Sequence, residues 1–449
     1  MKKLFALLLA AMLLVTSVAA LAEAPEGYPE VVDGIDFGGD TVYIWLYWAP
    51  NARSADPTEE QQARYDYQDW IMETYNVKIV EEQKTDWSTC AQEMIDFATV
   101  NNGEKAIFVV EPGKAPTVMS IAAPWNNDLV DLTAEKWNQG DLDFMTKGGK
   151  VYGVYAGATE PRQLLYFNKR VLEEANIDWE TLYDMQADGT WTWETFEDLL
   201  KQITRDTDND GVNDVYGIVG NFDDMQVMSV FTNGGTFFDF NDEGLLEPTM
   251  NSDEALSGLA WAKSIYENYW MPTPDGANWD WYKEAFKAGD VGFYMYQAYG
   301  GFNANDPTST EMYGMADEWG AVAFPTPRGG GYFAVGSDNF WMIPNVYDEE
   351  TTAKIAFIYD LWSNDTPGYE DADENWQGQM YNETDDRAVD ETYDMLRHAG
   401  ASNKVTYLGT QNDVLGNSLL WSLASGTPAE LVNAGMPTWQ ALCDTFNAK

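Results

Sequence analysis

Hydrophobic positions in the N-terminal part of the chain form short apolar runs separated by amphipathic stretches. The runs at 41–48, 77–80 and 105–110 are rich in β-branched and aromatic residues, which is typical of buried strands. The stretches at 56–76 and 85–100 repeat apolar residues at helical spacing. This alternating order predicts a parallel sheet with helices on its faces. Ligands of such sheets bind at the carboxyl ends of the strands, which directs attention to the loops after the first and third runs.

Capping residues predict where helices begin. Asp56 is expected to cap the first helix, with Pro57 at its first position and Glu59 at its third. Further along, Thr192 is expected to cap a helix over 191–204.

A second α/β region follows the first. Helical or alternating patterns predict helices at 191–204, 252–270, 281–287 and 348–363, and strands at 215–219, 291–296, 321–324 and 333–343. The turn-rich segment PTPRGGG at 325–331 is expected to link two structural units.

The sequence DTDNDGVNDVYGI at 206–218 resembles the first half of a calcium loop. Asp206, Asp208, Asp210 and Asp214 occupy positions 1, 3, 5 and 9 of such a loop, but position 12 is Gly217 where a bidentate Glu would complete it. Two interpretations stay open. The loop holds a structural calcium ion, or it is a polar turn whose Asp side chains bind local N–H groups. No other cofactor is expected.

The first residues are typical of a secretory signal peptide. Lys2 and Lys3 precede the apolar stretch 4–18, and Ala20-Leu21-Ala22 forms a cleavage signal. We therefore assign residues 1–22 to a signal peptide and expect an exported protein, periplasmic or extracellular at the cell surface. No lipid-anchor cysteine follows the cleavage signal, so the sequence leaves open how the protein stays near a membrane.

Composition restricts the classes of molecule that this protein can bind. The formal net charge is -49, from 25 basic and 74 acidic residues, which disfavours nucleic acid and anionic membranes. Disorder does not explain the acidity, because 45% of the residues are hydrophobic. We expect a monomer with a solvated acidic surface.

Cysteine and histidine are scarce. Cys90 and Cys443 are the only cysteines, and Cys90 falls on the apolar side of a predicted helix, so we expect it in the core. His398 is the only histidine, which argues against Ser-His-Asp and Cys-His catalysis and excludes H-E-x-x-H zinc sites. If the protein is an enzyme, its catalytic groups are therefore carboxylates; otherwise it catalyses no reaction.

Several segments, in order, resemble a known family. They are GKVYGV at 149–154, LLYFNKRVLEEANID at 164–178, TWTWETFEDLLKQITRDTDNDGVNDVYGI at 190–218, FKAGDVGFYMY at 286–296 and WGAVAFPTPRGGG at 319–331. Together they are similar to the extracellular solute-binding proteins of ABC importers, of the sugar-binding type that includes maltodextrin-binding protein. The chain departs from the family pattern at Tyr155, where a Pro is usual, and at Asn176, where a Gly is usual.

The resemblance implies a two-lobed α/β fold of the type II periplasmic-binding-protein class, with a hinged cleft between the lobes. By this analogy lobe 1 spans 23–158 and receives a return segment at 334–364. Lobe 2 spans 159–333 and includes the C-terminal segment 365–449. The resemblance also implies a small solute, most simply a carbohydrate, and an ABC transporter permease as partners.

Candidate ligand-binding residues in lobe 1 follow strand ends. Sugars present C–H faces to aromatic rings and hydroxyls to carboxylates and amides, so pockets of these residue types suit them. Tyr47, Trp48 and Asn51 follow the first strand, and Trp48 is the first choice for stacking, although it would serve equally well in the core. Glu111 follows the third strand at a position where the family often has a ligand-facing polar residue, although a solvated loop carboxylate would suit this position equally well.

Further candidates lie in the segments that cross between the lobes and in lobe 2. The ligand-facing set also contains Glu160, Arg162, Phe222, Asp223, Gln297, Tyr299, Asp338, Asn339 and Trp341. Tyr299 aligns with a stacking aromatic of the family. Arg162 could pair with Glu160 at the hinge instead, and Trp341 could pack within a strand core.

Two other function classes remain open from the sequence. A secreted glycoside hydrolase needs only a pair of carboxylates, but no spacing in this chain singles out such a pair, so no catalytic residue is assigned. A surface sensor or adhesin could use the same two-lobed fold without transport.

Overall fold

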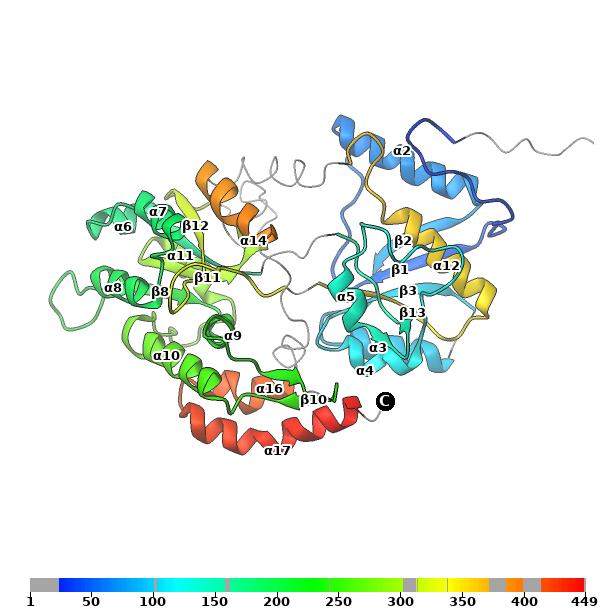
Figure 1. The fold of residues 1–449 in the computed structure, drawn as a ribbon. Coiled ribbons are helices and arrows are strands. Elements are labelled where there is room, and N and C mark those ends of the chain that lie inside the picture. Colours follow the sequence, from blue (N-terminus) through cyan, green and yellow to red (C-terminus); the bar gives the residue numbers. More distant parts are fainter. Residues whose placement is uncertain are drawn as a thin grey trace, which may run out of the picture.

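The fold comes from a computed structural model that describes residues 24–100, 103–157, 162–241, 243–301, 312, 314–336, 338–370, 385–398 and 413–447. The expected signal peptide at 1–22 lies outside the described residues. Two α/β bodies stand side by side (Figure 1), each built on its own sheet. We call the body around the first sheet lobe 1 and the body around the second sheet lobe 2.

The sheet of lobe 1 has the strand order β2-β1-β3-β13-β4. Its strands are β1 Thr41–Leu46, β2 Lys78–Gln83, β3 Lys105–Val110, β4 Ala122–Ala123 and β13 Phe340–Pro344, and a small hairpin joins β5 Thr146–Lys147 to β6 Lys150–Val151. The accompanying helices are α2 Glu59–Thr74, α3 Cys90–Val100, α4 Ala115–Val118, α5 Gln139–Phe144 and α12 Glu349–Trp362, with a 3-10 turn η1 at Met119–Ile121.

Alternation along the strands of lobe 1 divides its core into two layers. Ile44 and Leu46 of β1 pack with Ile71 of α2 and Ile355 of α12 on one face of the sheet. Trp45, between them in sequence, packs with residues of α3 and α4 on the other face. Figure 1 shows the same arrangement, with α2 and α12 on one side and α3 and α4 on the other.

The sheet of lobe 2 has the strand order β12-β7-β11-β8. Its strands are β7 Gln163–Asn168, β8 Tyr216–Gly220, β11 Val291–Gln297 and β12 Trp319–Ala323, and β9 Phe238–Phe240 pairs with β10 Leu246–Pro248. The α-helices are α6 Lys169–Glu174, α7 Glu180–Asp188, α8 Trp193–Ile203, α9 Phe222–Thr232, α10 Asp253–Tyr269, α11 Trp281–Ala288, α14 Asp394–His398, α16 Asp413–Ser418 and α17 Pro428–Asn447. Shorter turns are η2 Ala298–Gly301, the π-helical η3 Ala388–Tyr393 and η4 Leu420–Ser422.

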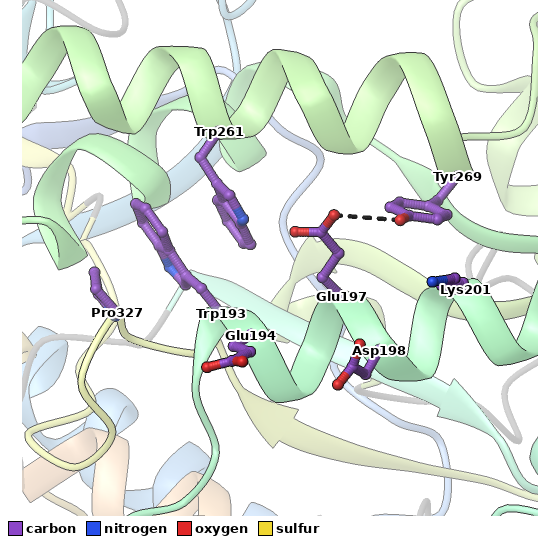
Figure 2. Close-up of a pocket in the computed structure, with 8 residues that line it drawn as sticks. All are labelled: Trp193, Glu194, Glu197, Asp198, Lys201, Trp261, Tyr269 and Pro327. Atoms are coloured by element: carbon purple, nitrogen blue, oxygen red, sulfur yellow. Dashed lines mark hydrogen bonds between the residues drawn. The ribbon is translucent and has the colours of Figure 1, made fainter.

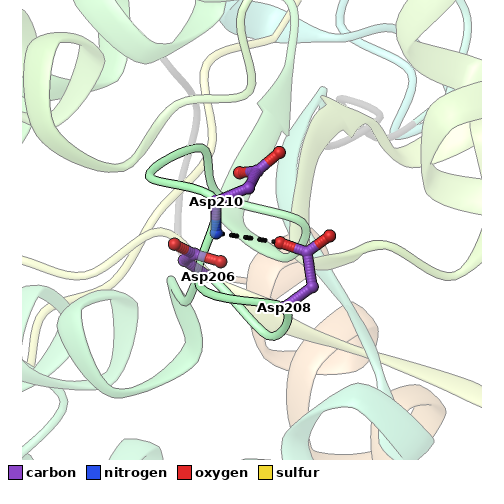
Figure 3. A group of neighbouring side chains, drawn as sticks. All are labelled: Asp206, Asp208 and Asp210. Carbon is purple, nitrogen blue, oxygen red and sulfur yellow. Dashed lines mark hydrogen bonds between the residues drawn. The ribbon is translucent and has the colours of Figure 1, made fainter.

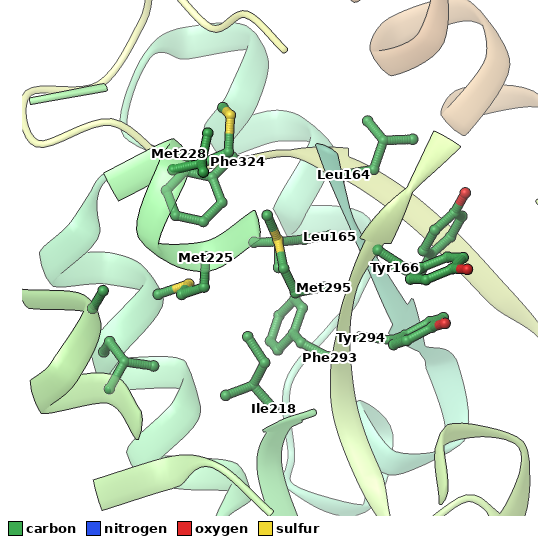
Figure 4. Packing of buried hydrophobic residues seen from close by; sticks show 14 of the residues in the cluster. Leu164, Leu165, Tyr166, Ile218, Met225, Met228, Phe293, Tyr294, Met295 and Phe324 are labelled. Carbon is green, nitrogen blue, oxygen red and sulfur yellow. The ribbon is translucent and has the colours of Figure 1, made fainter. Parts of the chain in front are cut away.

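One continuous core fills lobe 2. Figure 4 shows Leu165 and Phe293 on the side of the sheet that α9 covers, with Met225 of α9 against them. Tyr166 and Tyr294 point to the opposite side of the same strands, with ring centroids 5.9 Å apart. Because every strand of this sheet is buried on both faces, its residues read as continuous apolar runs.

Most predicted elements are confirmed, with small shifts at their ends. The strand at 105–110 is found without change, and Thr192 caps α8 by accepting a hydrogen bond from the backbone N–H of Thr195. Asn176 adopts the left-handed backbone conformation (φ 58°) that its place in the resemblance required.

The parallel pairing predicted for the first three strands is confirmed, because β1 pairs in parallel with both β2 and β3. The complete sheets are mixed, since β13 runs antiparallel to β3 and β7 runs antiparallel to β11. Two predictions about elements are corrected. Helix α3 begins at Cys90 and not at residue 85, because Asp86 accepts backbone hydrogen bonds from Ser88 and Thr89 in a separate turn. The strand predicted over 333–343 begins only at Phe340, where pairing with Val110 starts.

The cap of α2 also differs from the prediction. Thr58, not Asp56, is the N-cap, and its hydroxyl accepts from the backbone N–H of Gln61 at 3.1 Å. The Gln61 side chain accepts in return from the backbone N–H of Thr58 at 3.0 Å. This reciprocal capping box satisfies two N–H groups that Asp56 would leave open.

The predicted lobe boundaries near residues 158 and 334 fall between segments of the two sheets, and they stay predictions. The sheet of lobe 1 takes β13 from the return segment, and the sheet of lobe 2 lies wholly between residues 163 and 323.

Candidate functional site

Parallel strands bring the candidate residues of lobe 1 to one edge of its sheet. Strands β1, β2 and β3 run parallel, so the loops that follow them lie next to one another. Tyr47 and Trp48 follow β1, Trp87 lies in the turn after β2, and Glu111 follows β3. Asn339 reaches the same edge immediately before β13.

Tyr47 connects this edge to lobe 2. Its hydroxyl donates a 2.6 Å hydrogen bond to Oδ1 of Asn339. Burial raises the pKa of Tyr47, the charge of Glu111 raises it further, and the charge of Arg162 acts in the opposite direction. Arg162 directly precedes β7 of lobe 2, and its charge lowers the pKa of the Tyr47 phenol in lobe 1. The predicted residues Tyr47, Glu111, Arg162 and Asn339 are thus brought together.

Glu111 is almost fully buried and holds a local network. Its carboxylate accepts from the backbone N–H of Gly113 at 3.0 Å and from Nζ of Lys114 at 3.2 Å. Burial raises the pKa of Glu111, and the charge of Lys114 partly offsets this. The Lys114 ammonium lies 3.5 Å from the ring centroid of Trp87. Glu111 therefore positions Lys114, and through it supports an aromatic ring.

Trp87 is a candidate that the sequence analysis missed. Its side chain is 43% exposed, although it stands between a strand and a helix. The helix predicted to start at residue 85 begins only at Cys90, so Trp87 lies in the turn before it. Its place directly after a parallel strand was the signal that could have identified it.

A groove on lobe 1 joins three of the predicted residues. Trp48, Asn51 and Trp341 all line a hollow of about 1090 Å³. Trp48 is 37% exposed and meets the ring of Tyr47 edge to face, with centroids 4.8 Å apart. Trp341 is half-buried and stacks on Tyr359 at 5.8 Å. The ring of Trp341 also contacts Tyr155, at a centroid distance of 6.0 Å, so Trp48 is the more open of the two Trp rings on the groove.

In lobe 2, β8 and β11 run parallel and place a second polar cluster at their carboxyl ends. Asn221 caps α9, and Asp223 and Asp224 fill its first turn. Gln297 ends β11, where its Oε1 accepts from Nη1 of Arg162 at 3.4 Å. The predicted residues Arg162 and Gln297 are therefore neighbours, and both act on Asp224, which is next in sequence to the predicted Asp223.

The two carboxylates of α9 are strongly perturbed. Burial, followed by the charge of Asp224, raises the pKa of Asp223 to about 7. Burial also raises the pKa of Asp224 to about 6, although the amide of Gln163 donates to its carboxylate at 3.2 Å. The N-terminus of α9 favours negative charge there, but desolvation outweighs it.

Trp421 is the second candidate that the sequence analysis missed. It lies in η4, and its indole N–H donates a 2.8 Å hydrogen bond to Oδ2 of Asp223. Its side chain is 50% exposed. No local pattern marks this residue, because its partner lies 198 positions earlier in the chain.

The remaining predicted residues differ in their surroundings. The ring of Phe222 is engaged by Tyr266, at a centroid distance of 4.4 Å, and by Trp270 at 5.4 Å. Asp338 is buried just before β13. Glu160 and the side chain of Tyr299 lie outside the described residues.

The lobes also approach each other at a second place. A cavity of about 1000 Å³ is lined by Phe144 and Tyr152 of lobe 1 and by Phe240, Leu245 and Phe446 of lobe 2. It lies beyond β4, at the edge of the first sheet opposite to β2. The space between the lobes is therefore bordered by polar groups at the strand ends and by apolar side chains at this edge.

The acidic loop forms a cluster of carboxylates that resembles part of a cation-binding site (Figure 3). Carboxylate oxygens of Asp206, Asp208 and Asp210 lie within 4.8 Å of one another. Asp214 points elsewhere, because its Oδ2 accepts from the backbone N–H of Thr207 at 2.7 Å. The loop also makes internal hydrogen bonds, such as Asp210 N–H to Asp208 Oδ1 at 3.0 Å. Calcium binding by this loop stays a prediction, with three of the four Asp in place.

With this geometry in view, the comparisons with known proteins identify the family. A profile described as "Bacterial extracellular solute-binding protein" matches residues 66–378. The chain belongs to the bacterial extracellular solute-binding proteins. No curated protein matches the chain.

Solved structures confirm the fold of this solute-binding protein. An ABC substrate-binding protein from Listeria monocytogenes in complex with cycloalternan matches with a TM-score of 0.60 at 14% identity, covering 90% of this chain and 98% of that chain. The cyclic α-maltosyl-1,6-maltose binding protein from Arthrobacter globiformis matches at 0.60 and 16%, covering 91% and 100%. UgpB from Mycobacterium tuberculosis in complex with glycerophosphocholine also gives 0.60, at 14% identity, covering 91% and 100%. These likenesses confirm the predicted type II two-lobed α/β fold.

Family membership settles several broader points. This is a solute-binding protein of an ABC transporter, so a small solute and the transporter are its partners. The family is non-catalytic, which excludes the glycoside hydrolase alternative. It is also an extracellular family, and within the described part of the chain no helix is both long and apolar enough to cross a membrane.

Proposed function

We propose that this solute-binding protein captures a carbohydrate, most simply an oligosaccharide, between its lobes and delivers it to the permease of the ABC transporter. One observation carries the proposal. Trp87 of lobe 1 and Trp421 of lobe 2 are partly exposed, the first beside the Lys114 ammonium that Glu111 holds and the second beside the Asp223 carboxylate. Exposed rings next to hydrogen-bonding groups suit the C–H faces and hydroxyls of sugars.

The polar groups favour a neutral ligand over an anionic one. Asp223 and Asp224 stand together in the first turn of α9, and burial raises both pKa values, so added negative charge nearby would be costly. Arg162 is the cation beside them, and it is already engaged by Gln297. A solute with a net negative charge is therefore disfavoured. Neutral saccharides, including the cyclic saccharides named for the Listeria and Arthrobacter neighbours, are compatible with this cluster.

A ligand screen tests the proposal. The mature protein is heated with a panel of mono- and oligosaccharides, polyols and glycerophosphodiesters, and the unfolding midpoint is recorded. A saccharide at about a hundred times its Kd should stabilise the protein by about 2.7 kcal/mol. Stabilisation only by phosphodiesters, or by nothing in the panel, would overturn the carbohydrate proposal.

Variants of the two rings locate the binding site. Trp87→Ala and Trp421→Ala should each weaken binding of the stabilising saccharide roughly tenfold, because a stacked ring contributes on the order of 1 kcal/mol or more. Trp279→Ala is the matched control, since this ring is 70% exposed in the segment between α10 and α11. Isothermal titration calorimetry measures the affinities. Equal losses in all three variants would place the ligand elsewhere.

A further inference from the structure

A second hollow lies on lobe 2, in the part that Figure 1 shows remote from lobe 1. It occupies about 360 Å³ between α8 and α10. Its lining contains Trp193, Glu194, Glu197, Asp198, Lys201, Trp261, Tyr269 and Pro327 (Figure 2). We call it the α8/α10 groove.

One wall of the α8/α10 groove is a rigid aromatic stack. Trp193 and Trp261 lie face to face, with centroids 4.0 Å apart and planes only 2° from parallel. The indole N–H of Trp193 donates to the carbonyl of Pro325 at 3.1 Å, and its backbone N–H donates to the carbonyl of Thr326 at 3.1 Å. Because one ring is held by the backbone and covers the other, the stack loses little freedom when a ligand packs against it.

Carboxylate side chains of α8 lie next to this aromatic stack. In Figure 2 the carboxylate of Glu197 lies between Trp261 and Tyr269, and the Tyr269 hydroxyl donates to it at 3.2 Å. Glu194 and Asp198 lie on the same helix beside it, and Lys201 lies one turn further along. Burial first, then the charges of Glu197 and Asp198, raise the pKa of Tyr269.

We propose that the α8/α10 groove binds a guanidinium group. A guanidinium is planar, so it stacks on the face of an indole, and its N–H groups match the two oxygens of a carboxylate. Trp261 supplies the ring and Glu197 supplies the carboxylate. Tyr269 closes the opposite side, two helical turns from Trp261 on α10, or about 12 Å along the axis.

The composition of the groove distinguishes this ligand from a sugar. Glu197 lies among the aromatic rings, and with Glu194 and Asp198 it outweighs the single cation of the lining, Lys201, so the groove attracts a cation more than a neutral hydroxyl ligand. The formal net charge of -49 adds a general attraction for cations. The groove and the proposed sugar site lie in different parts of the molecule, so either proposal can fail without the other.

The test compares two ligands of the same shape. Butylguanidinium and its uncharged isostere butylurea are titrated into the mature protein at about 150 mM salt, where charges beyond about 8 Å are screened. Saturation-transfer NMR on the butyl protons reports binding. Butylguanidinium should bind at least tenfold more tightly than butylurea. Equal binding of the two would overturn the proposal.

Variants tie the binding to the groove. Glu197→Gln should weaken butylguanidinium binding at least fivefold, and Trp261→Leu should do the same in protein shown to be folded by circular dichroism. Glu60→Gln is the charge-matched control, because Glu60 is an exposed acid on α2 of lobe 1, and this change should leave binding unaltered. Equal effects of Glu197→Gln and Glu60→Gln would reduce the interaction to non-specific attraction and overturn the proposal.

A titration with a peptide identifies the source of the guanidinium group. Acetyl-Gly-Arg-Gly-amide carries the same guanidinium on a polypeptide. Binding as tight as that of butylguanidinium supports an arginine side chain of a partner protein as the occupant. Much weaker binding of the peptide supports a small guanidinium compound instead.

Discussion

At the residue scale, the two carboxylates in the first turn of α9, Asp224 buried and Asp223 partly buried, lie where ionisation is disfavoured. Asp223 and Asp224 are adjacent in sequence, and both enter a region where desolvation disfavours ionisation. The indole N–H of Trp421 and the amide of Gln163 compensate only in part. An apolar residue would be more stable here, so we infer that the carboxylates are kept for the ligand.

This perturbation predicts a pH-dependent stability. The pKa of Asp223 is about 7 in the folded protein, above its ordinary value of 3.8, so the folded state keeps a proton that the unfolded state has lost. This contribution is fully present below pH 3.8 and disappears as the pH rises through about 7. Asp223→Asn replaces the carboxyl by an amide that does not ionise, so the variant does not lose this stability as the pH rises. The variant should therefore gain stability over the original protein between pH 4 and pH 8, by on the order of 2 kcal/mol.

Urea unfolding at a series of pH values measures the effect. Glu60→Gln serves as the control, because Glu60 is an exposed acid on α2 in the other lobe. Parallel curves for Asp223→Asn and the original protein would contradict the prediction.

At the element scale, the start of α2 shows how a helix selects its cap. Both Asp56 and Thr58 are good N-cap residues by type. Thr58 prevails because Gln61 stands three positions later and completes the box from its side chain. The prediction from sequence matched the pattern Asp-Pro but overlooked this reciprocal pair.

Two substitutions compare the alternatives. Thr58→Ala should lower the free energy of unfolding by about 1 kcal/mol, since it removes the cap of a helix that packs on the sheet of lobe 1. Asp56→Ala should have almost no effect. Equilibrium unfolding in urea distinguishes them, and the reverse order of losses would restore Asp56 as the cap.

The acidic loop between α8 and β8 is the second element with a testable charge. Three carboxylates within 4.8 Å repel one another unless a cation or a proton intervenes. If the loop binds calcium, millimolar calcium should raise the thermal midpoint by several degrees over EDTA. The rise should disappear in Asp208→Asn and persist in Asp214→Asn, because Asp214 is turned toward Thr207. A midpoint independent of calcium would favour the polar-turn interpretation.

At the scale of the whole molecule, polar groups at the strand ends of the two lobes lie close together. Tyr47 and Asn339 of lobe 1 lie near Arg162 of lobe 2, and the lobes meet again around Phe144 and Phe240. Two-lobed proteins of this kind close by hinge motion around their ligand. A ligand that contacts both lobes shifts the equilibrium toward the closed form.

Small-angle X-ray scattering tests this closure. The radius of gyration should fall when the saccharide identified in the thermal screen is added, and it should stay constant with a saccharide that gives no thermal shift. The change should be reduced in Trp421→Ala at the same ligand concentration, because the ring of lobe 2 is then missing. An unchanged radius with a tightly bound ligand would place that ligand within a single lobe.

The sequence by itself determined the elements and the family. Strands such as β3 and helices such as α8 follow from apolar periodicity and caps within a few residues, so local patterns sufficed. The order of motifs from residue 149 to residue 331 carried the resemblance that the comparisons confirmed. Residues directly after strands, such as Tyr47 and Glu111, were found because a parallel sheet fixes where its loops go.

The tertiary structure alone decided which distant residues meet. Strand β13 pairs with β3 although hundreds of residues separate them, and it runs antiparallel, which no local pattern encodes. Trp421 reaches Asp223, and Trp193 stacks on Trp261, because packing of helices brings remote side chains together. Burial, and with it the pKa of Asp223, depends on all the surrounding elements at once. Such contacts are properties of the folded chain, and periodicity in a single sequence carries no record of them.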